Sequence, residues 1–381
     1  MNLFILHLSL IKGIGPVTIS YLIEKLEANG IVDLYALTLT DLQRLGISAK
    51  QAQIIREGLQ ESTLLEKELE QYKKYSIEWC TYKDDQYPEL LKHIYAPPAV
   101  ITWQGDIAYD KAMAIVGSRD ATDYGKQTVD FFVPQLIDAG YTIVSGGAYG
   151  IDARAHEATI EMGGKTIVVL GSGLAKPYPR EHIKLFDRVV EKGGAIVSIF
   201  PVMTSAAPGN FPARNRVIAG LSQGCIVVQA ASKSGAKITA EFALQQGRSV
   251  FAVPGPINHP LSEGCHDLIK QGATILTSFE DIAQEFGITQ YRKPIIVPSE
   301  RTEATETVRS DIKMVVKQYS KIEQVDMHPI VALCKTPQSF DDVLQKFPEK
   351  NAAELQDLLF DLSLEGLIEQ DFSGMWKKAV R

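Results

Sequence analysis

Two glycine-rich stretches hold the residues of this chain that are most able to do chemistry. The first is Gly117-Ser118-Arg119, directly after the apolar run 114–116, and the second is residues 145–152, directly after the apolar run 142–144. Glycine lets a backbone approach a ligand closely, and the free N–H groups at a helix start attract anions. Because the planar guanidinium of Arg119 suits phosphate, the pattern predicts a phosphate-bearing ligand held by loops rather than by a catalytic triad.

Small-residue loops of the same kind recur farther along the chain, at 171–173, 232–239 and 254–256. The fingerprint GxGxxG and the Walker A motif are both absent, so we expect neither a dinucleotide site nor an ATPase. The stretch Ser234-Gly235-Ala236-Lys237 resembles a P-loop in composition, but the spacing of its residues does not match the Walker A motif. We interpret it as a phosphate-binding or packing turn.

The triplet Arg214-Asn215-Arg216 precedes the apolar residues Val217 and Ile218. We expect it to open a helix, so that the first turn concentrates positive charge where the helix dipole already favours anions. We also expect one of the two arginines to make an internal salt bridge, and the sequence leaves open which one.

Asp152 and His156 stand four residues apart and therefore share one face of a helix. A carboxylate–imidazole pair is able to do acid–base work, but no Ser or Cys nucleophile and no metal-ligand cluster accompanies it. We expect a cap or a buried polar network here, and we assign no catalytic residue, no metal and no cofactor.

Strand, glycine loop and helix repeat through the middle of the chain, which is typical of an α/β fold with a Rossmann-like, mostly parallel sheet. Seven apolar runs are expected to be strands, starting near Ala112, Tyr141, Thr166, Ala195, Cys225, Ser249 and Ala273. We expect Val100–Trp103 to be an edge strand. Since ligands of such sheets bind at the carboxyl ends of the strands, the loops above belong to one site.

We expect four parts along the chain. Residues 1–62 resemble a helical helix-hairpin-helix (SAM-like) domain around the turn Lys12–Pro16, with a degenerate second copy at Leu45–Ser48; such a hairpin either binds phosphate or only packs. Residues 63–287 form the α/β domain with its lead-in, and 288–325 are a linker. Residues 326–381 resemble a winged helix, whose second helix, 352–365, is acidic, so we expect a protein-docking or regulatory role rather than binding to duplex DNA.

Composition sets bounds on the function. The net charge of −7 excludes a generally basic surface, so any nucleic-acid site has to be a local patch. The four cysteines lie far apart, which fits a reducing cytoplasm and argues against a structural zinc. No apolar run is long enough to span a membrane, and the apolar N-terminus lacks the basic start of a signal peptide.

Seven segments together resemble the DNA processing protein A (DprA/Smf) family. In order they are VGSRDATDYG, SGGAYGIDARAH, GGKTIVVLGSGL, YPREH, FPARNRVIAGLS, SGAKITAEFALQQGRSVFAVPG and LIKQGA. The resemblance implies a cytoplasmic, non-enzymatic protein without a cofactor that binds single-stranded DNA. It implies protection of incoming single strands during natural transformation, loading of the RecA recombinase, and a homodimer formed through the α/β domain.

The resemblance and the loops together predict the DNA- or phosphate-binding residues. They are Gly117, Ser118, Arg119, Ser145, Gly146, Gly147, Tyr149, Gly150, Gly171, Ser172, Gly173, Arg180, Arg214, Asn215, Arg216, Ser234 and Lys237. Tyr149, Tyr178 and Phe211 lie near these loops and either stack on bases or pack as core or rim residues.

The chain departs from the family pattern at two places. The family loop usually reads SGLARGID, whereas Gly147 and Tyr149 stand here in place of Leu and Arg; the family strand usually ends S-E-x-P, whereas Ile199 stands here in place of Glu. A phosphate contact is therefore in doubt at Tyr149. The alternative function is a Rossmann-like enzyme acting on a nucleotide or nucleoside monophosphate, but the nearest match to its PGGxGTxxE loop, residues 234–241, keeps only a Gly, a Thr and a Glu.

Overall fold

The computed structural model describes residues 1–289 and 329–347, together with residues 355, 358–359, 362, 368–370 and 375–378. The chain divides into two compact units, Met1–Pro294 and Ile295–Arg381. The expected linker at 288–325 therefore lies almost wholly outside the described residues, and the four domain boundaries stay predictions.

A nine-stranded sheet forms the centre of the first unit, in the order β1-β2-β6-β5-β4-β3-β7-β8-β9. The strands from β6 to β9 in this order are parallel, whereas β1 and β2 add to the sheet in antiparallel fashion. Their bounds are β1 Glu78–Thr81, β2 Val100–Gly105, β3 Ala112–Val116, β4 Thr142–Ser145, β5 Thr166–Val169, β6 Ala195–Ser198, β7 Gly224–Val227, β8 Ser249–Ala252 and β9 Thr274–Ile275.

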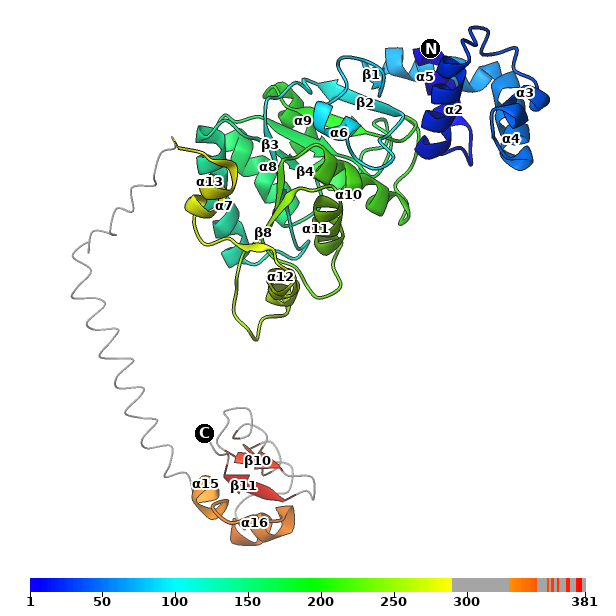
Figure 1. The fold of residues 1–381 in the computed structure, drawn as a ribbon. Helices are drawn as coiled ribbons and strands as arrows, with labels where there is room; N and C mark the ends of the chain where they lie inside the picture. The colour runs from blue at the N-terminus through cyan, green and yellow to red at the C-terminus, as the bar shows by residue number, and fades with distance from the viewer. Residues whose placement is uncertain are drawn as a thin grey trace. The chain divides into compact units, whose positions relative to one another are not determined.

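Helices cover both faces of the sheet (Figure 1). In β3, Ala112, Ala114 and Val116 pack into the core below one set of helices, and Met113 and Ile115 pack into the core on the opposite face. This alternation explains why the strands read as unbroken apolar runs. The helices are α6 Glu89–Lys92, α7 Asp123–Asp138, α8 Ile151–Glu161, α9 Ile183–Glu191, α10 Asn210–Gly220, α11 Gly235–Gln245, α12 Pro260–Lys270 and α13 Phe279–Phe286, with a 3-10 turn at Arg180–His182.

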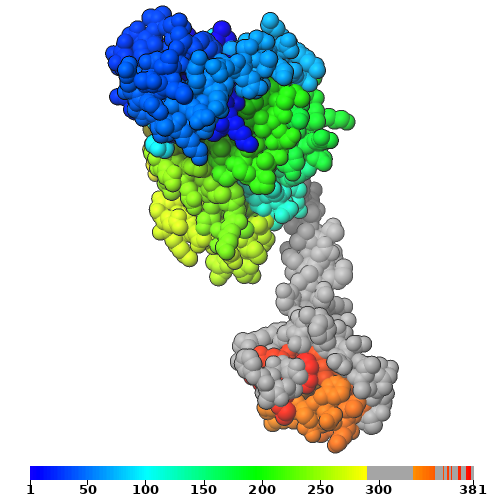
Figure 2. Space-filling view, turned by 90° about the vertical axis from the view of Figure 1, so that its right-hand side faces the viewer, coloured from blue at the N-terminus to red at the C-terminus, as the bar shows by residue number. Residues whose placement is uncertain are grey.

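The N-terminal residues are helical, as expected. Two helix pairs, α1 Asn2–Leu10 with α2 Pro16–Ala28 and α3 Leu39–Arg44 with α4 Ala49–Gln60, are followed by α5 Ser62–Lys74. The turn between α1 and α2 contains Gly13, whose φ of 91° is a conformation that glycine adopts readily and other residues rarely adopt. These helices share one hydrophobic core with the sheet and α9, and Figure 2 shows them (blue) packed directly against the α/β body (green).

All seven predicted strands and the α/β class are confirmed, but the prediction of an edge strand at Val100–Trp103 is wrong. Strand β2 lies between β1 and β6, with Cys80 paired to Ile101 on one side and Val197 paired to Trp103 on the other. The edge belongs to β1, because residues 78–81 extend the sheet by one more strand. The prolines near β2 precede the strand, so they do not remove hydrogen bonds from its ladder.

The second unit contains α15 Pro329–Leu333, α16 Phe340–Lys346 and the antiparallel pair β10 Ile368–Gln370 and β11 Trp376–Lys378. The two strands pair in antiparallel fashion, as in the wing of a winged helix, and Ser339 caps α16 through a reciprocal bond with Asp342. Most of the expected helix at 352–365 lies outside the described residues. Among the described residues, no helix is long and apolar enough to cross a membrane, and all four cysteines are free and buried.

A buried carboxyl group fastens the N-terminal helices to the sheet. Glu68 of α5 is only 8% exposed, and its carboxyl oxygen accepts a hydrogen bond of 2.8 Å from the backbone N–H of Val202. Burial raises the pKa of Glu68 above its ordinary value of 4.5, against the opposing effects of the hydrogen bonds with Val202 and Tyr72.

This burial predicts a pH-dependent difference between the wild type and Glu68→Gln, which keeps the acceptor oxygen but does not titrate. Because the pKa of Glu68 is raised in the folded state, its contribution to stability is present below 4.5 and is lost as the pH rises through the folded-state pKa. Urea unfolding followed by tryptophan fluorescence at several pH values checks this. The wild type should lose stability relative to the variant across that window, and a difference that does not depend on pH would contradict the role of burial.

Candidate nucleic-acid interface

The glycine loops meet at the point where the sheet changes its winding direction. The chain passes from β3 to β4 on one side of β3, and it later returns from β6 to β7 on the other side. Ligands of open α/β sheets bind at such a switch point, outside the carboxyl ends of the strands. A cavity of about 480 Å³ opens there and is lined by residues that include Gly117, Ser118, Arg119, Phe211, Arg214 and Ser234. We call this cavity the strand-end pocket.

The first two glycine loops are fastened to each other through Gly150. Its φ is 75° and its ψ is −119°, and a Cβ atom at this position would clash with the carbonyl oxygens of Ser118 and Arg119. The next residue, Ile151, donates its backbone N–H to Ser118 at 3.1 Å. Ser145 adds a side-chain bond of 2.6 Å to the carbonyl of Ile115. Only glycine fits between the two loops, so the loop that contains Gly150 packs directly against the backbone around Arg119 and fixes it in place.

Arg214 supports the floor of the strand-end pocket from inside the protein. It is 5% exposed, and its Nη1 donates to the carbonyl oxygens of Gly146 and Val169, the latter at 2.7 Å. Its Nε donates to the side chain of Asn215 at 3.0 Å. Burial lowers the pKa of Arg214 to about 10, and the nearby carboxylate of Asp152 opposes that effect. Of the two arginines in the triplet, Arg214 is therefore the internal one, but within residues 1–289 it makes hydrogen bonds to neutral acceptors and the expected internal salt bridge does not form.

The expectation that the triplet opens a helix is wrong. Helix α10 begins at Asn210, so Arg214 lies beyond its first turn. Pro212 lies in that first turn, where backbone N–H groups have no acceptor within the helix, so a proline is tolerated. The helix therefore starts earlier than the apolar periodicity suggests. The concentration of arginine charge at the helix start does not occur.

Asp152 and His156 are both buried and hydrogen-bonded, in keeping with the expectation of a structural role, but their partners are different. Asp152 accepts backbone hydrogen bonds from Gly146 at 3.1 Å and Ala148 at 3.4 Å, and burial raises its pKa. The ring of His156 lies 2.7 Å from the hydroxyl of Thr166, and complete burial lowers its pKa to about 3. His156 is therefore neutral at physiological pH, and both side chains shape the loop between β4 and α8.

Arg119 is exposed at the mouth of the strand-end pocket, unlike Arg214. In residues 1–289 no ion pair involves Arg119, so it is not paired with the neighbouring Asp120 or Asp123. Its guanidinium carbon lies 5.6 Å from the centre of the Phe211 ring. Arg214 lies 5.8 Å from the same centre, so two guanidinium groups approach one aromatic ring.

Phe211 also lines a second, larger cavity next to the strand-end pocket. This neighbouring cavity has a volume of about 800 Å³, and its lining includes Tyr178, Arg180, Pro208 and Phe211. The rings of Tyr178 and Phe211 lie 6.1 Å apart. The two cavities therefore form a continuous surface that carries aromatic side chains and the exposed charges of Arg119 and Arg180.

Several predicted site residues lie behind this surface or away from it. Gly171 packs against the Phe211 ring, the carbonyl of Ser172 accepts a hydrogen bond from the Ser198 hydroxyl, and Gly173 faces the loop 201–204. Gly147 packs on Phe186, Tyr149 donates its hydroxyl to Glu181 at 2.7 Å, and Lys237 pairs with Asp267 at 3.0 Å. Arg216 projects from another side of α10, where it donates to the carbonyl of Tyr95 at 3.3 Å. Asn215 donates to Gly235 at 3.2 Å and holds α10 against α11.

Sequence reasoning missed the segment Ser205–Pro208, which lines the larger cavity. A signal was available, because Ala206-Ala207-Pro208-Gly209 is a run of small and turn-forming residues directly before a helix. Among the described residues, no group of three metal-binding side chains is present.

Residues 78–287 of this chain match the family of the DNA recombination-mediator protein A. DNA processing protein DprA of Bacillus subtilis is 43% identical over 228 residues, which cover 58% of this chain and 76% of that protein. The crystal structure of DNA processing protein A from Streptococcus pneumoniae matches with a TM-score of 0.65 at 33% identity, covering 75% of this chain and 98% of that one.

A structure of DNA processing protein A from Helicobacter pylori, described for its single-stranded DNA binding mode, matches with a TM-score of 0.50 at 27% identity. It covers 55% of this chain and 95% of that one. The match at 78–287 contains every strand of the large sheet and every loop of the strand-end pocket. The chain belongs to the DNA recombination-mediator protein A family.

Proposed function

We propose that this protein binds single-stranded DNA along the strand-end pocket and the neighbouring cavity. The observation that carries the proposal is the exposed Arg119 guanidinium beside the Phe211 ring, at the boundary of the two cavities. Single-strand binding needs positive charge for the backbone and aromatic faces for the bases. A Phe ring accepts any base, which favours binding without sequence preference.

The wider role follows from the family. A relative from Helicobacter pylori is described for binding single-stranded DNA, and the family is described as a recombination mediator. We accordingly propose that this protein protects incoming single strands during natural transformation and loads the RecA recombinase on them, as a homodimer formed through the α/β domain. We propose binding without catalysis, since His156 is buried and the Asp152 carboxylate is occupied by backbone donors.

Replacing Arg119 with Ala should weaken the binding of a fluorescent single-stranded oligonucleotide about tenfold at low salt, since a hydrogen bond to a charged group contributes on the order of 1.5 kcal/mol. The loss should be alike for all base sequences. The salt dependence should also become shallower, by about 0.7 in the slope of log K against log salt for each phosphate contact removed. Fluorescence anisotropy across a salt series measures both effects, with the matching duplex as competitor.

The matched control is Lys111→Ala, which removes one positive charge just before β3, at the opposite end of the strands. It should leave the affinity close to that of the wild type. An Arg119→Ala variant that binds like this control, or a wild type that prefers duplex, would contradict the proposed site; nucleotide hydrolysis would then be measured next.

Replacing Phe211 with Ala should weaken binding by about 1–3 kcal/mol if one base stacks on the ring, and Phe211→Trp should retain the affinity. The same anisotropy assay measures this, and thermal unfolding shows whether the variants are folded. Phe131→Ala is the control, since Phe131 is an exposed aromatic of α7 that packs on Phe132. Equal affinities of the Ala and Trp variants would show that the ring does not stack on a base.

A further inference from the structure

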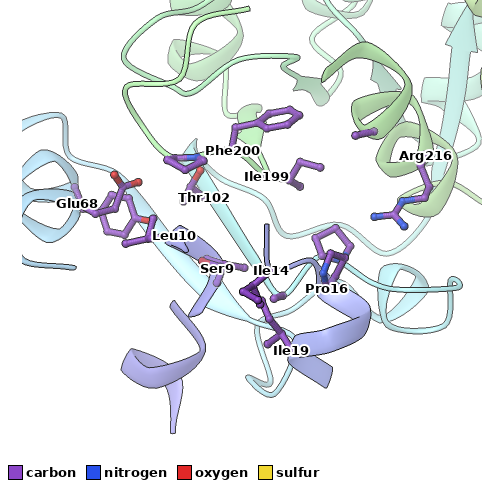
Figure 3. Close-up of a pocket in the computed structure, with 16 residues that line it drawn as sticks. Ser9, Leu10, Ile14, Pro16, Ile19, Glu68, Thr102, Ile199, Phe200 and Arg216 are labelled. Carbon is purple, nitrogen blue, oxygen red and sulfur yellow. The ribbon is translucent and has the colours of Figure 1, made fainter. Parts of the chain in front are cut away.

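A third cavity lies between the N-terminal helices and the sheet, and it shares no lining residue with the strand-end pocket. Its volume is about 300 Å³, at the lower end of the range for pockets that take small organic ligands. Figure 3 shows its walls, which come from α1, α2, α5, β2, the β6–α10 loop and α10. Helix α10 contributes to both cavities, with Ala213 and Arg216 lining this one and Phe211 and Arg214 lining the other.

The middle of this cavity is apolar. The N-terminal helices contribute Ile14, Pro16 and Ile19, and the α/β body contributes residues such as Ile199 and Phe200. Apolar walls that stay in contact with water are unfavourable. The cavity therefore favours a ligand with an apolar body.

Arg216 places a positive charge at one end of the cavity, and Figure 3 shows its guanidinium pointing inward. In the described part of the chain, the guanidinium group makes one hydrogen bond, the contact of 3.3 Å with the Tyr95 carbonyl. Its Nε is buried without a partner, and within residues 1–289 Arg216 takes part in no ion pair. A guanidinium carries five N–H donors in a fork that matches a carboxylate or a phosphate; with Nε buried and one Nη1 donor bonded to Tyr95, the other Nη donors are those that an anion would use.

Glu68 lies at the other end of the cavity, apart from Arg216 (Figure 3). Its carboxyl group is already engaged by the Val202 N–H. A ligand with two anionic ends would place one of them against this acid. The two charged residues therefore fix an orientation, with the single acidic group of the ligand at Arg216 and its apolar body toward Glu68.

We propose that this cavity is a binding site for a small organic acid, in which Arg216 binds the carboxylate or phosphate and the walls between Ile14 and Phe200 enclose the apolar body. The site is independent of the proposed DNA site, because the residues that line the two cavities differ.

Isothermal titration calorimetry of the full chain tests the site with three probes: phenylacetate, phenyl phosphate and the neutral phenylacetamide. At least one of the acids should bind saturably, with a dissociation constant on the order of a millimolar for so small a ligand. The amide should bind about tenfold more weakly, because it lacks the charge-assisted contact. The difference between the two acids identifies which anionic group the site prefers.

Two variants locate the binding. Arg216→Met removes the charge but keeps the length of the side chain, and it should weaken the binding of the acid about tenfold. Ala213→Leu fills the cavity from α10 with a good helix former, and it should abolish binding without unfolding the protein, as thermal unfolding verifies. Arg119→Ala is the control and should bind the probe like the wild type.

Three outcomes would overturn the proposal: no saturable binding of either acid, equal binding of acid and amide, or wild-type binding by Ala213→Leu. Since the probes are titrated without DNA, a failure of the proposed DNA site leaves these measurements unchanged. If Arg216→Met does not fold, Ala213→Leu and the amide decide the question.

Discussion

The buried charge of Arg214 is the constraint on which the strand-end pocket depends. A guanidinium removed from water is strongly destabilising unless acceptors surround it. Here the acceptors are the carbonyls of Gly146 and Val169, which lie just beyond or at the ends of two neighbouring strands, β4 and β5. The same residue, Gly146, donates its N–H to Asp152. The backbone of one residue thus lies between the guanidinium and the carboxyl group, and a Cβ atom at Gly146 would meet both side chains.

The contacts of Arg214 show which parts of the site the sequence alone predicts and which it does not. The strands and their loops could be predicted, because an unbroken apolar run followed by Gly and Ser has few other interpretations in an α/β chain. The sequence does not show which of Arg214 and Arg216 is buried. Residues two positions apart on a helix are rotated by about 200° around its axis, so the two side chains face different sides. The identity of the buried arginine depended on where the carbonyls of other strands lie, which is long-range information.

The position of β2 shows a similar limit. The composition of residues 100–103 fits a strand, but whether a strand lies at an edge depends on pairing with residues distant in sequence, here β1 and β6. The N-terminal residues that the sequence predicts to be helical are helical in the structure. Its core, however, does not end near residue 62: Phe4 and Leu22 belong to the same cluster of buried residues as Val168 and Phe186. Local periodicity predicts helices, but it does not show which of their apolar faces pack into one core with the sheet.

The contact between Gly150 and the carbonyls of Ser118 and Arg119 has a consequence for recognition. Because the loops are braced against one another, their backbone has little conformational freedom left to lose when a ligand arrives. The entropy lost on association then falls mainly on the ligand, and a flexible polymer must adopt the shape of a rigid pocket. For the single-stranded DNA that we propose as the ligand, base-paired or self-stacked segments would be disfavoured by their own stiffness, without any contact that reads their sequence.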